Sequence, residues 1–559
     1  CPSGAETLPI PFDGARSYFS YDPAEKVLRF DDVSVDSQWV SAETTGTAVL
    51  GLTPNGKLRD LVGQVAIRNL RTNPDQMYET PVALAGADVD FQLSLDPFHL
   101  QLGRLQISDQ GKTLLLDGDL VAEPKGWRVA LDGRMDGLAL DRLFTLWPAR
   151  LKVKTRTWLS QNLLGGTASN LDLALRLAPG QAPQTYAAFD FADADVKFMK
   201  TLPPITGATG TFSLLDNRLV VAVDQGTVKA DEGGIVTVRG SSFIIPDVRV
   251  REGAPSVIRL QTNSSVTAAL SLLNRAPLSV MDKARLPVTL AKGRAALTGT
   301  LAVPLKKGSA KEVVYDVAGT LRAVSTETLI KGRKLSAPSL EVVVDNSGLL
   351  LTGAGDLDGV AFDGSFAQPI GAGAGKSSLR AQVILDQSAL DNFGIALPDG
   401  TVAGRTPAQL DVDLAKGQAP RFALRSDLRG MRLSVPQLNW SKAPSSGGTL
   451  QVSGLLGTPP VIENLEVSGP GLTAKGAVDL RADGALDRVR VDSLRAGDWL
   501  DAAVDIVGQG PGNPVQVVLR GGTLDLRRAD LGGDSGGAST RGPPGPSKTT
   551  FWWAAVSGT

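Results

Sequence analysis

The sequence predicts a mainly β protein whose strands form a long, twisted antiparallel sheet. Three observations support this class: apolar and polar residues alternate in many short runs, turn-forming dipeptides separate those runs, and helical patterns are few and short. Alternation with a period of two puts apolar side chains on one face of a strand and polar side chains on the other. We therefore expect a sheet with one apolar face and one polar face, as antiparallel sheets allow.

Two runs, residues 89–95 and 171–177, show the alternation most clearly. Their apolar positions are Val89, Phe91, Leu93, Leu95, Leu171, Leu173, Leu175 and Leu177. Segments such as LDNR, DNSG and RADG separate the runs, because Asn, Asp and Gly accept the backbone angles of tight turns. A Gly-Thr-apolar step also recurs, and we interpret it as a device that starts a strand. It occurs at Gly210, Gly299, Gly319, Gly448 and Gly522.

Residues 146–167 differ from the strands on either side. They contain Trp147, Trp158 and four basic residues, and TRTWLSQNLLGG predicts about three helical turns that end at the Gly165-Gly166 pair. The basic residues are suited to contact anionic lipid headgroups. The alternative is a solvated helix that caps one end of the sheet. Residues 265–275 and 388–397 are weaker helix candidates.

These patterns divide the chain into four parts. Residues 1–145 form an N-terminal β segment, residues 146–167 a Trp-bearing helical insert, and residues 168–531 a repeated β segment. Residues 532–559 begin with a low-complexity stretch rich in Gly and Pro, and we expect this tail to be disordered.

Composition argues against several classes of function. The formal net charge is −1, which does not indicate a nucleic-acid-binding surface. The chain has a single Cys and a single His, so an internal disulfide and the usual zinc ligand sets are not available. We interpret His99 as an ordinary strand residue, and the pairs Asp88/Asp90 and Asp411/Asp413 as solvated charges on polar faces. We expect no enzyme activity, no metal and no cofactor.

Several segments resemble one known family. WP followed by KTRTWLSQNLLGG and an alternating LDLALRL strand resembles the AsmA-like proteins of Gram-negative bacteria, specifically the YhdP-type branch. FADADVKFMKTLPPITGATGTFSLLDNRLVV resembles a recurring unit of that branch, and MRLSVPQLNWSKAPSSGGTLQVSG resembles a later copy. The similarity of character covers roughly residues 10–530.

The resemblance implies an open, taco-like β-groove with an apolar concave side, similar to bridge-like lipid transfer proteins. Such proteins are thought to carry phospholipid across the periplasm between the inner and outer membranes. The resemblance also implies an N-terminal helix that anchors the full-length protein in the inner membrane. The sequence contains no apolar run of about 18 residues, so we expect this helix to lie outside it.

We therefore expect non-enzymatic phospholipid transport, with the eight alternating apolar residues lining the groove. Trp147 and Trp158 would be apolar contacts of an insert that closes one groove edge. The expected partners are phospholipids and the two membranes, with no nucleic acid and with protein partners left open. An alternative is a scaffold or chaperone for outer-membrane protein assembly that uses exposed strand edges. A third possibility, a glycan-binding or glycan-cleaving module, fits less well because aromatic residues are few.

Overall fold

The computed structural model describes residues 12–527, except residues 251, 307, 331, 372–374, 394, 396, 398–399, 416, 458, 483–484, 511–514 and 526. The predicted tail at 532–559 lies outside the described residues. The chain divides into two compact units, and each is described here by itself. Unit 1 comprises Cys1–Thr289 and Arg294–Val317, and unit 2 comprises Leu290–Gly293 and Ala318–Thr559.

The mainly β prediction is confirmed, since the described residues form 31 strands and few short helices. The strands of unit 1 are β1 (Gly14–Asp22), β2 (Val27–Asp36), β3 (Val40–Leu52), β4 (Leu58–Thr72), β5 (Val82–Leu95), β6 (Phe98–Asp109), β7 (Lys112–Glu123), β8 (Gly126–Ala139), β9 (Leu163–Leu177), β10 (Gln184–Val196), β11 (Ile205–Leu215), β12 (Arg218–Lys229), β13 (Ile235–Thr237), β14 (Ser242–Ile245), β15 (Ala254–Ser265) and most of β16 (Lys292–Leu305).

Unit 2 begins within β17 and continues to the last described strand. Its strands are β17 (Val314–Ile330), β18 (Arg333–Asp345), β19 (Gly348–Leu357), β20 (Val360–Pro369), β21 (Ser377–Asp386), β22 (Val402–Leu414), β23 (Arg421–Ser426), β24 (Met431–Val435), β25 (Trp440–Lys442), β26 (Thr449–Leu455), β27 (Val461–Gly469), β28 (Leu472–Leu480), β29 (Leu486–Ala496), β30 (Leu500–Val507) and β31 (Gln516–Leu524).

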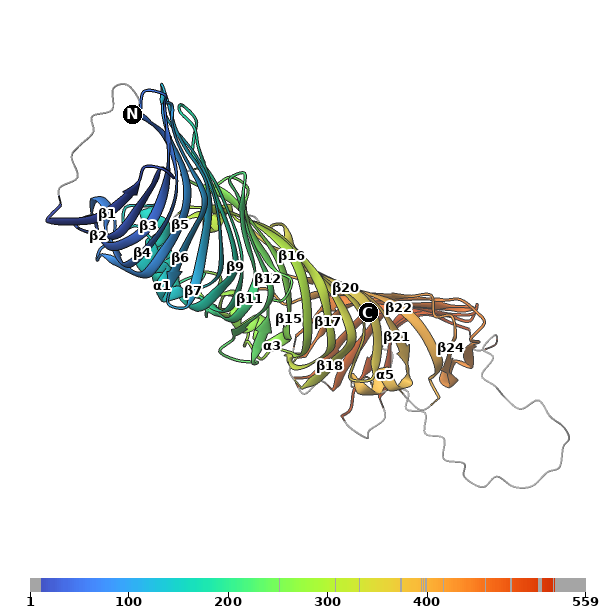
Figure 1. The fold of residues 1–559 in the computed structure, drawn as a ribbon. Coiled ribbons are helices and arrows are strands. Elements are labelled where there is room, and N and C mark those ends of the chain that lie inside the picture. The colour runs from blue at the N-terminus through green and yellow to red at the C-terminus, as the bar shows by residue number, and fades with distance from the viewer. Residues whose placement is uncertain are drawn as a thin grey trace, which may run out of the picture. The chain divides into compact units, whose positions relative to one another are not determined.

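Both units are antiparallel meanders, in which each strand pairs with the strand before it and the strand after it (Figure 1). In unit 1, β13 and β14 together take one strand position between β12 and β15. In unit 2, β23 pairs with β22 and β26, while β24 and β25 form a hairpin that pairs with the start of β22. Sequential pairing of this kind follows from short connections, which leave neighbours in sequence as neighbours in space.

The connections of a meander alternate between the two ends of the strands, and in unit 1 the helices gather at one end. α1 (Leu140–Leu146) and α2 (Val153–Asn162) join β8 to β9, and α3 (Val266–Leu273) and α4 (Val280–Ala284) join β15 to β16. The 3-10 turn η1 (Pro74–Gln76), between β4 and β5, lies at the same end. We call this end of unit 1 the helical rim and the opposite end the turn rim (Figure 1).

The remaining short helical elements are η2 (Ser309–Glu312) in unit 1, and α5 (Gln387–Asn392) and η3 (Pro436–Leu438) in unit 2. The helix expected in residues 265–275 is confirmed as α3, whereas α5 covers only the first part of the candidate at 388–397. The insert differs from expectation, because α2 ends at Asn162 and LLGG belongs to β9. Leu163 pairs with Val196 and Gly165 with Asp195, so the sheet ladder replaces the last helical turn.

At two places on the helical rim, a single arginine side chain links three successive connections between strands. Arg142 of α1 donates to both carboxylate oxygens of Asp109, at 2.6 and 2.7 Å, and to the carbonyl of Ala83, at 2.8 Å. Arg275, which follows α3, likewise binds the carboxylate of Asp231 and the carbonyl of Thr201. We call each such set an arginine clamp. The clamps add side-chain bonds across the rim to backbone bonds such as the one from the Ala149 N–H to the carbonyl of Met77, at 2.7 Å.

The recurring Gly-Thr-apolar step has a different role from the one expected. At Gly448 a strand does begin with the following Thr, but Gly210, Gly299, Gly319 and Gly522 lie inside strands, so the interpretation as a strand start was wrong for them. A Cβ at Gly210 would lie 2.0 Å from the carbonyl oxygen of Ala222, and one at Gly299 would lie 2.5 Å from that of Asp316. Glycine is required at these positions because the neighbouring backbone approaches too closely for a side chain.

Candidate functional site

The candidate functional site is the apolar face of the unit 1 sheet. Residues directly opposite each other in an antiparallel pair point to the same face, so the strand register defines which side chains share it. Four rows of paired residues cross β5 to β9, and Leu95 pairs with Phe98 beside them. The rows are Ala87–Ile107–Leu114–Met135–Leu171, Val89–Leu105–Leu116–Gly133–Leu173, Phe91–Leu102–Gly118–Leu131–Leu175 and Leu93–Leu100–Leu120–Val129–Leu177.

The register brings all eight sequence-predicted apolar residues to this one face. Three rows join a predicted residue of β5 to a predicted residue of β9 through apolar residues or glycines of β6, β7 and β8. The intervening strands also alternate, as in Leu114, Leu116 and Leu120 of β7, but sequence alone does not give their register. The strand pairing, and not the local sequence, therefore decides that these residues share one face.

The apolar face is only partly withdrawn from solvent. Leu95 is 41% exposed and Leu173 is 39% exposed, whereas Leu171 is 7% exposed and the other five predicted residues are half-buried. Within the described ranges, each strand makes extensive contacts only with its neighbours in the sheet and with adjoining helices. The side chains of the face are thus shielded mainly by one another, without an opposing layer that would seal them.

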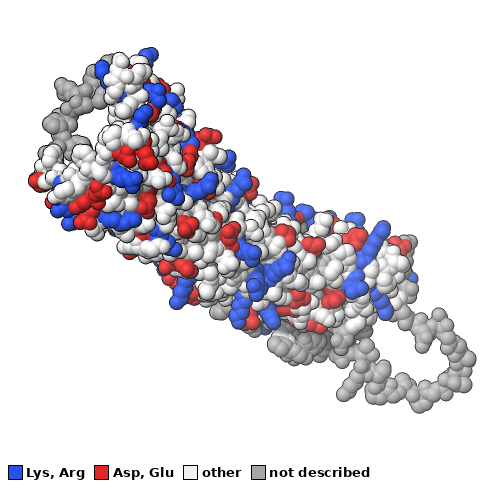
Figure 2. Space-filling view, in the orientation of Figure 1, with Lys and Arg blue, Asp and Glu red and all other residues white. Residues whose placement is uncertain are grey.

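The opposite face of the same strands is charged. Ion pairs connect neighbouring strands there, including Arg68 with Asp88 at 3.3 Å and Arg104 with Asp90 at 3.0 Å. Arg176 donates to Asp132 at 2.7 Å. Figure 2 shows basic and acidic side chains intermixed over the visible surface. The two faces therefore differ as the alternation predicted, since these ion pairs lie on the side away from the four apolar rows.

Unit 2 carries an apolar face of its own, which the sequence-based selection of residues did not include. Its strands pair apolar residues in the same manner from β18 to β31. One row is Val342–Leu351–Phe366–Leu379–Val412–Phe422–Gly454–Ile462–Val478–Val489–Ile506–Val517. The signal was present in runs such as AQLDVDL, whose alternation is the same as that of the chosen runs.

Comparison with known proteins places the chain in a family. A family model described as YhdP protein matches residues 28–527, which is most of the sequence. The chain belongs to the YhdP family. No curated protein and no solved structure matches it. The resemblance seen in the sequence is therefore confirmed, and the two apolar faces are features of a YhdP-family sheet.

The Trp-bearing insert of this YhdP-family chain lies on the helical rim. Trp147 is half-buried, and its indole N–H donates to the carbonyl of Leu151 at 2.8 Å. Trp158 of α2 is 47% exposed. Arg156 donates to Glu79 at 3.2 Å, which ties the insert to the β4–β5 connection. The longest described helix, α2, has ten residues, and no helix in the described ranges has the length and hydropathy of a membrane span.

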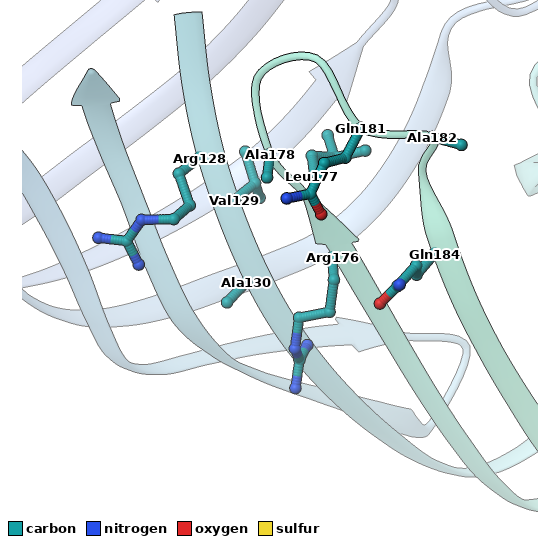
Figure 3. A pocket seen from close by; sticks show the side chains of 9 residues that line it. All are labelled: Arg128, Val129, Ala130, Arg176, Leu177, Ala178, Gln181, Ala182 and Gln184. Carbon is teal, nitrogen blue, oxygen red and sulfur yellow. The ribbon is translucent and has the colours of Figure 1, made fainter. Parts of the chain in front are cut away.

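A small pocket of about 210 Å³ lies at the turn rim, where β8, β9 and the β9–β10 connection meet (Figure 3). Val129 and Leu177 of the apolar face reach it, and Arg128, Arg176 and two glutamines supply its polar groups. Arg128 is paired with Glu123 at 2.9 Å, and Arg176 with Asp132. Because both guanidinium groups are already engaged with carboxylates, the pocket does not present a free cationic site.

The residues weighed as catalytic candidates lie in ordinary sheet surroundings. His99 contacts Asp119 at 2.7 Å across β6 and β7. Asp88 and Asp90 are ion-paired on the charged face, and Asp411 is paired with Arg425 at 3.5 Å. In the part of the chain that the structure describes, no group of three His, Cys, Asp or Glu residues is placed to hold a metal ion.

Proposed function

We propose that this chain is a non-enzymatic conduit for phospholipid, acting in the periplasm between the inner and outer membranes. The observation that carries the proposal is the apolar face of unit 1, which crosses five strands without a charged residue and is not sealed by an opposing layer within the described ranges. Contiguous exposed apolar surface of this kind marks a binding surface on a soluble protein. Membership of the YhdP family agrees with this assignment.

Acyl chains suit this face on energetic grounds. Each buried methylene contributes about 0.8 kcal/mol relative to water, so a lipid tail is held strongly against transfer to water. A tail that leaves a bilayer for the face moves between two apolar media, so the net free energy of transfer is small. Lipid can therefore move along the face in either direction without chemistry at the protein. Aliphatic side chains such as Leu131 and Leu175 contact a tail through non-directional dispersion forces, which do not hold it at one point.

The direct test is identification of lipid bound to the purified protein. We expect native mass spectrometry and organic extraction to find phospholipid with the chain after detergent-free purification. Protein that is folded but carries no phospholipid, and takes up none from vesicles, would contradict the proposal. A co-purifying outer-membrane barrel protein in place of lipid would support the assembly-scaffold alternative.

A matched pair of variants tests whether the apolar face is the binding site. Leu173 on the apolar face is 39% exposed, and Leu115 on the opposite face is 43% exposed. Leu115 pairs with Gln106 and Arg134, which places it among polar residues. We expect Leu173→Asp to lower the bound phospholipid per protein several-fold, because an uncompensated carboxylate is costly beside acyl chains.

The Leu115→Asp variant is the control, since it makes the same change at similar exposure on the charged face. Its phospholipid content should match that of the unchanged protein. Thermal unfolding checks that both variants fold. Equal loss of lipid in both folded variants would show that lipid is not held by the apolar face.

A further inference from the structure

Two segments on the helical rim of unit 1 are unusually basic. Residues 146–164 and 196–204 together contain Arg150, Lys152, Lys154, Arg156, Lys197 and Lys200, but no Asp or Glu, in a chain whose net charge is −1. The segments are adjacent in the fold, since the Lys197 N–H donates to the carbonyl of Asn162 at 2.7 Å and Leu163 pairs with Val196. We call these two segments the basic rim.

The lysines of the basic rim are available to an external partner. Lys152, Lys154 and Lys200 are exposed, and they form no ion pair within the described residues. Elsewhere in unit 1, basic residues such as Arg68 and Arg104 are neutralised by carboxylates of neighbouring strands. Arg156 of the basic rim pairs with an acid, Glu79. The basic rim therefore keeps a local excess of positive charge.

Large apolar side chains are exposed among these lysines. Val153 is 55% exposed, Trp158 is 47% exposed and Phe198 is 42% exposed. The other exposed apolar residues of the basic rim are Leu151, Leu164 and Met199, at 53%, 60% and 45%. Exposed Trp, Phe and aliphatic side chains beside unpaired lysines match a bilayer surface, where apolar groups enter the interface and lysines meet anionic headgroups.

We infer that the basic rim of unit 1 is a docking surface for an anionic membrane. This surface is separate from the apolar face, and its occupancy does not depend on lipid held there. Because the lysines lie at the strand ends, docking would bring the end of the apolar face towards the bilayer. We assign a membrane surface as the occupant because exposed apolar side chains lie among the lysines. A partner that offered only negative charge would leave these apolar side chains in water.

The test is flotation of the full chain with vesicles. Vesicles of phosphatidylcholine alone are compared with vesicles that also contain phosphatidylglycerol. We expect binding to the anionic vesicles that weakens as salt is raised, and little binding to the neutral ones. The triple variant Lys152→Glu/Lys154→Glu/Lys200→Glu should bind at least about 100-fold more weakly, because each lysine near an anionic surface contributes roughly a fivefold factor.

The matched control is Lys26→Glu/Lys57→Glu/Lys125→Glu, which makes the same change of net charge at exposed positions on the turn rim. This variant should keep most of its vesicle binding. Equal loss in both triple variants would reduce the effect to net charge and overturn the inference, as would absence of vesicle binding by the unchanged chain. The amount of phospholipid extracted with the first triple variant should equal that of the unchanged chain. Loss of vesicle binding is therefore distinguishable from loss of the phospholipid binding on which the proposed function rests.

Discussion

Glycine and aromatic residues face each other at several points in the described sheets. Gly63 pairs directly with Phe91 and Phe191 with Gly210 in unit 1, and Gly355 pairs with Phe362 in unit 2. A Cβ on these glycines would lie 2.7, 2.8 and 2.5 Å from an atom of the opposing ring. The ring thus covers the glycine backbone where the strand approaches closely. The few aromatic residues of the chain are used in part for this purpose.

Gly118 allows the closest approach on the apolar face, and its substitution is a sharp test of that geometry. Its φ is +148°, and a Cβ there would lie 2.0 Å from the carbonyl oxygen of Ala130. We expect Gly118→Ala to lower the free energy of unfolding by about 3 kcal/mol or more, because both the backbone angle and the contact are unfavourable. Denaturant unfolding followed by circular dichroism measures the change.

Gly103 provides the control for this substitution. It also lies inside a strand, but its nearest neighbour would be 3.6 Å from a new Cβ, an ordinary contact. Gly103→Ala should therefore change stability by less than about 1 kcal/mol. Equal losses of stability in the two variants would show that the close backbone approach does not explain why glycine is needed at position 118.

A buried lysine is the polar feature that sequence reasoning missed. Lys442, at the end of β25, is 1% exposed, and its ammonium group donates to the carbonyls of Leu428, Met431 and Ala443 at 2.6, 2.9 and 3.1 Å. Burial lowers its pKa from the usual value. A lysine in the segment NWSKAPSS reads as a surface residue, because nothing local shows that three carbonyls converge on it.

Among the elements, the arginine clamps explain how short helices are held against strand ends. Unit 2 has a third clamp, which again consists of an arginine, an aspartate and a backbone carbonyl on three successive connections. Arg333 begins β18, Asp358 follows β19, and the accepting carbonyl belongs to Asn392 of α5. The Asn392 side chain also donates to the carbonyl of Asp358 at 2.7 Å. Each clamp thus ties a connection that contains a helix to the two preceding connections at the same end of the strands.

The Arg142 clamp is expected to stabilise unit 1 more than any exposed ion pair does. Arg142 and Asp109 are 12% and 8% exposed in their side chains. We expect Arg142→Ala to lower the free energy of unfolding by about 3 kcal/mol or more, because the carboxylate of Asp109 would remain nearly buried without its partner. Denaturant unfolding measures this loss.

The comparison for the clamp is Arg134→Ala. Arg134 lies 3.6 Å from Asp172, and these side chains are 85% and 57% exposed. Removing this pair should cost less than about 1 kcal/mol. A loss for Arg142→Ala no larger than that for Arg134→Ala would show that the clamp does not hold the helical rim.

At the scale of the whole molecule, the described contacts are local. Each strand contacts the strands before and after it, so a perturbation is transmitted through neighbours in the manner of a repeat protein. We expect Gly118→Ala to increase amide hydrogen exchange in β6, β7 and β8 while leaving β28, β29 and β30 in unit 2 unchanged. Exchange measured by mass spectrometry tests this. An equal loss of protection in both units would indicate global cooperativity.

The sequence by itself determined the class of fold, the alternation of faces and the family. The eight apolar residues, the alternating DVDF and LDLALRL runs and α3 follow from local periods and turn residues, because side-chain direction in a strand depends only on its own backbone. The helix α2 falls within the predicted helical segment, but its predicted end was wrong, since pairing of Leu163 with Val196 depends on a strand distant in sequence.

Tertiary structure alone decided which runs share a face and whether that face is covered. Register places Leu93 and Leu177 in one row, and no local pattern encodes a register across four intervening pairings. The same alternation would suit a closed sandwich, in which a second sheet buries the apolar side. The exposure of Leu173 follows from the absence of such a layer within the described residues, which is a relation between distant segments.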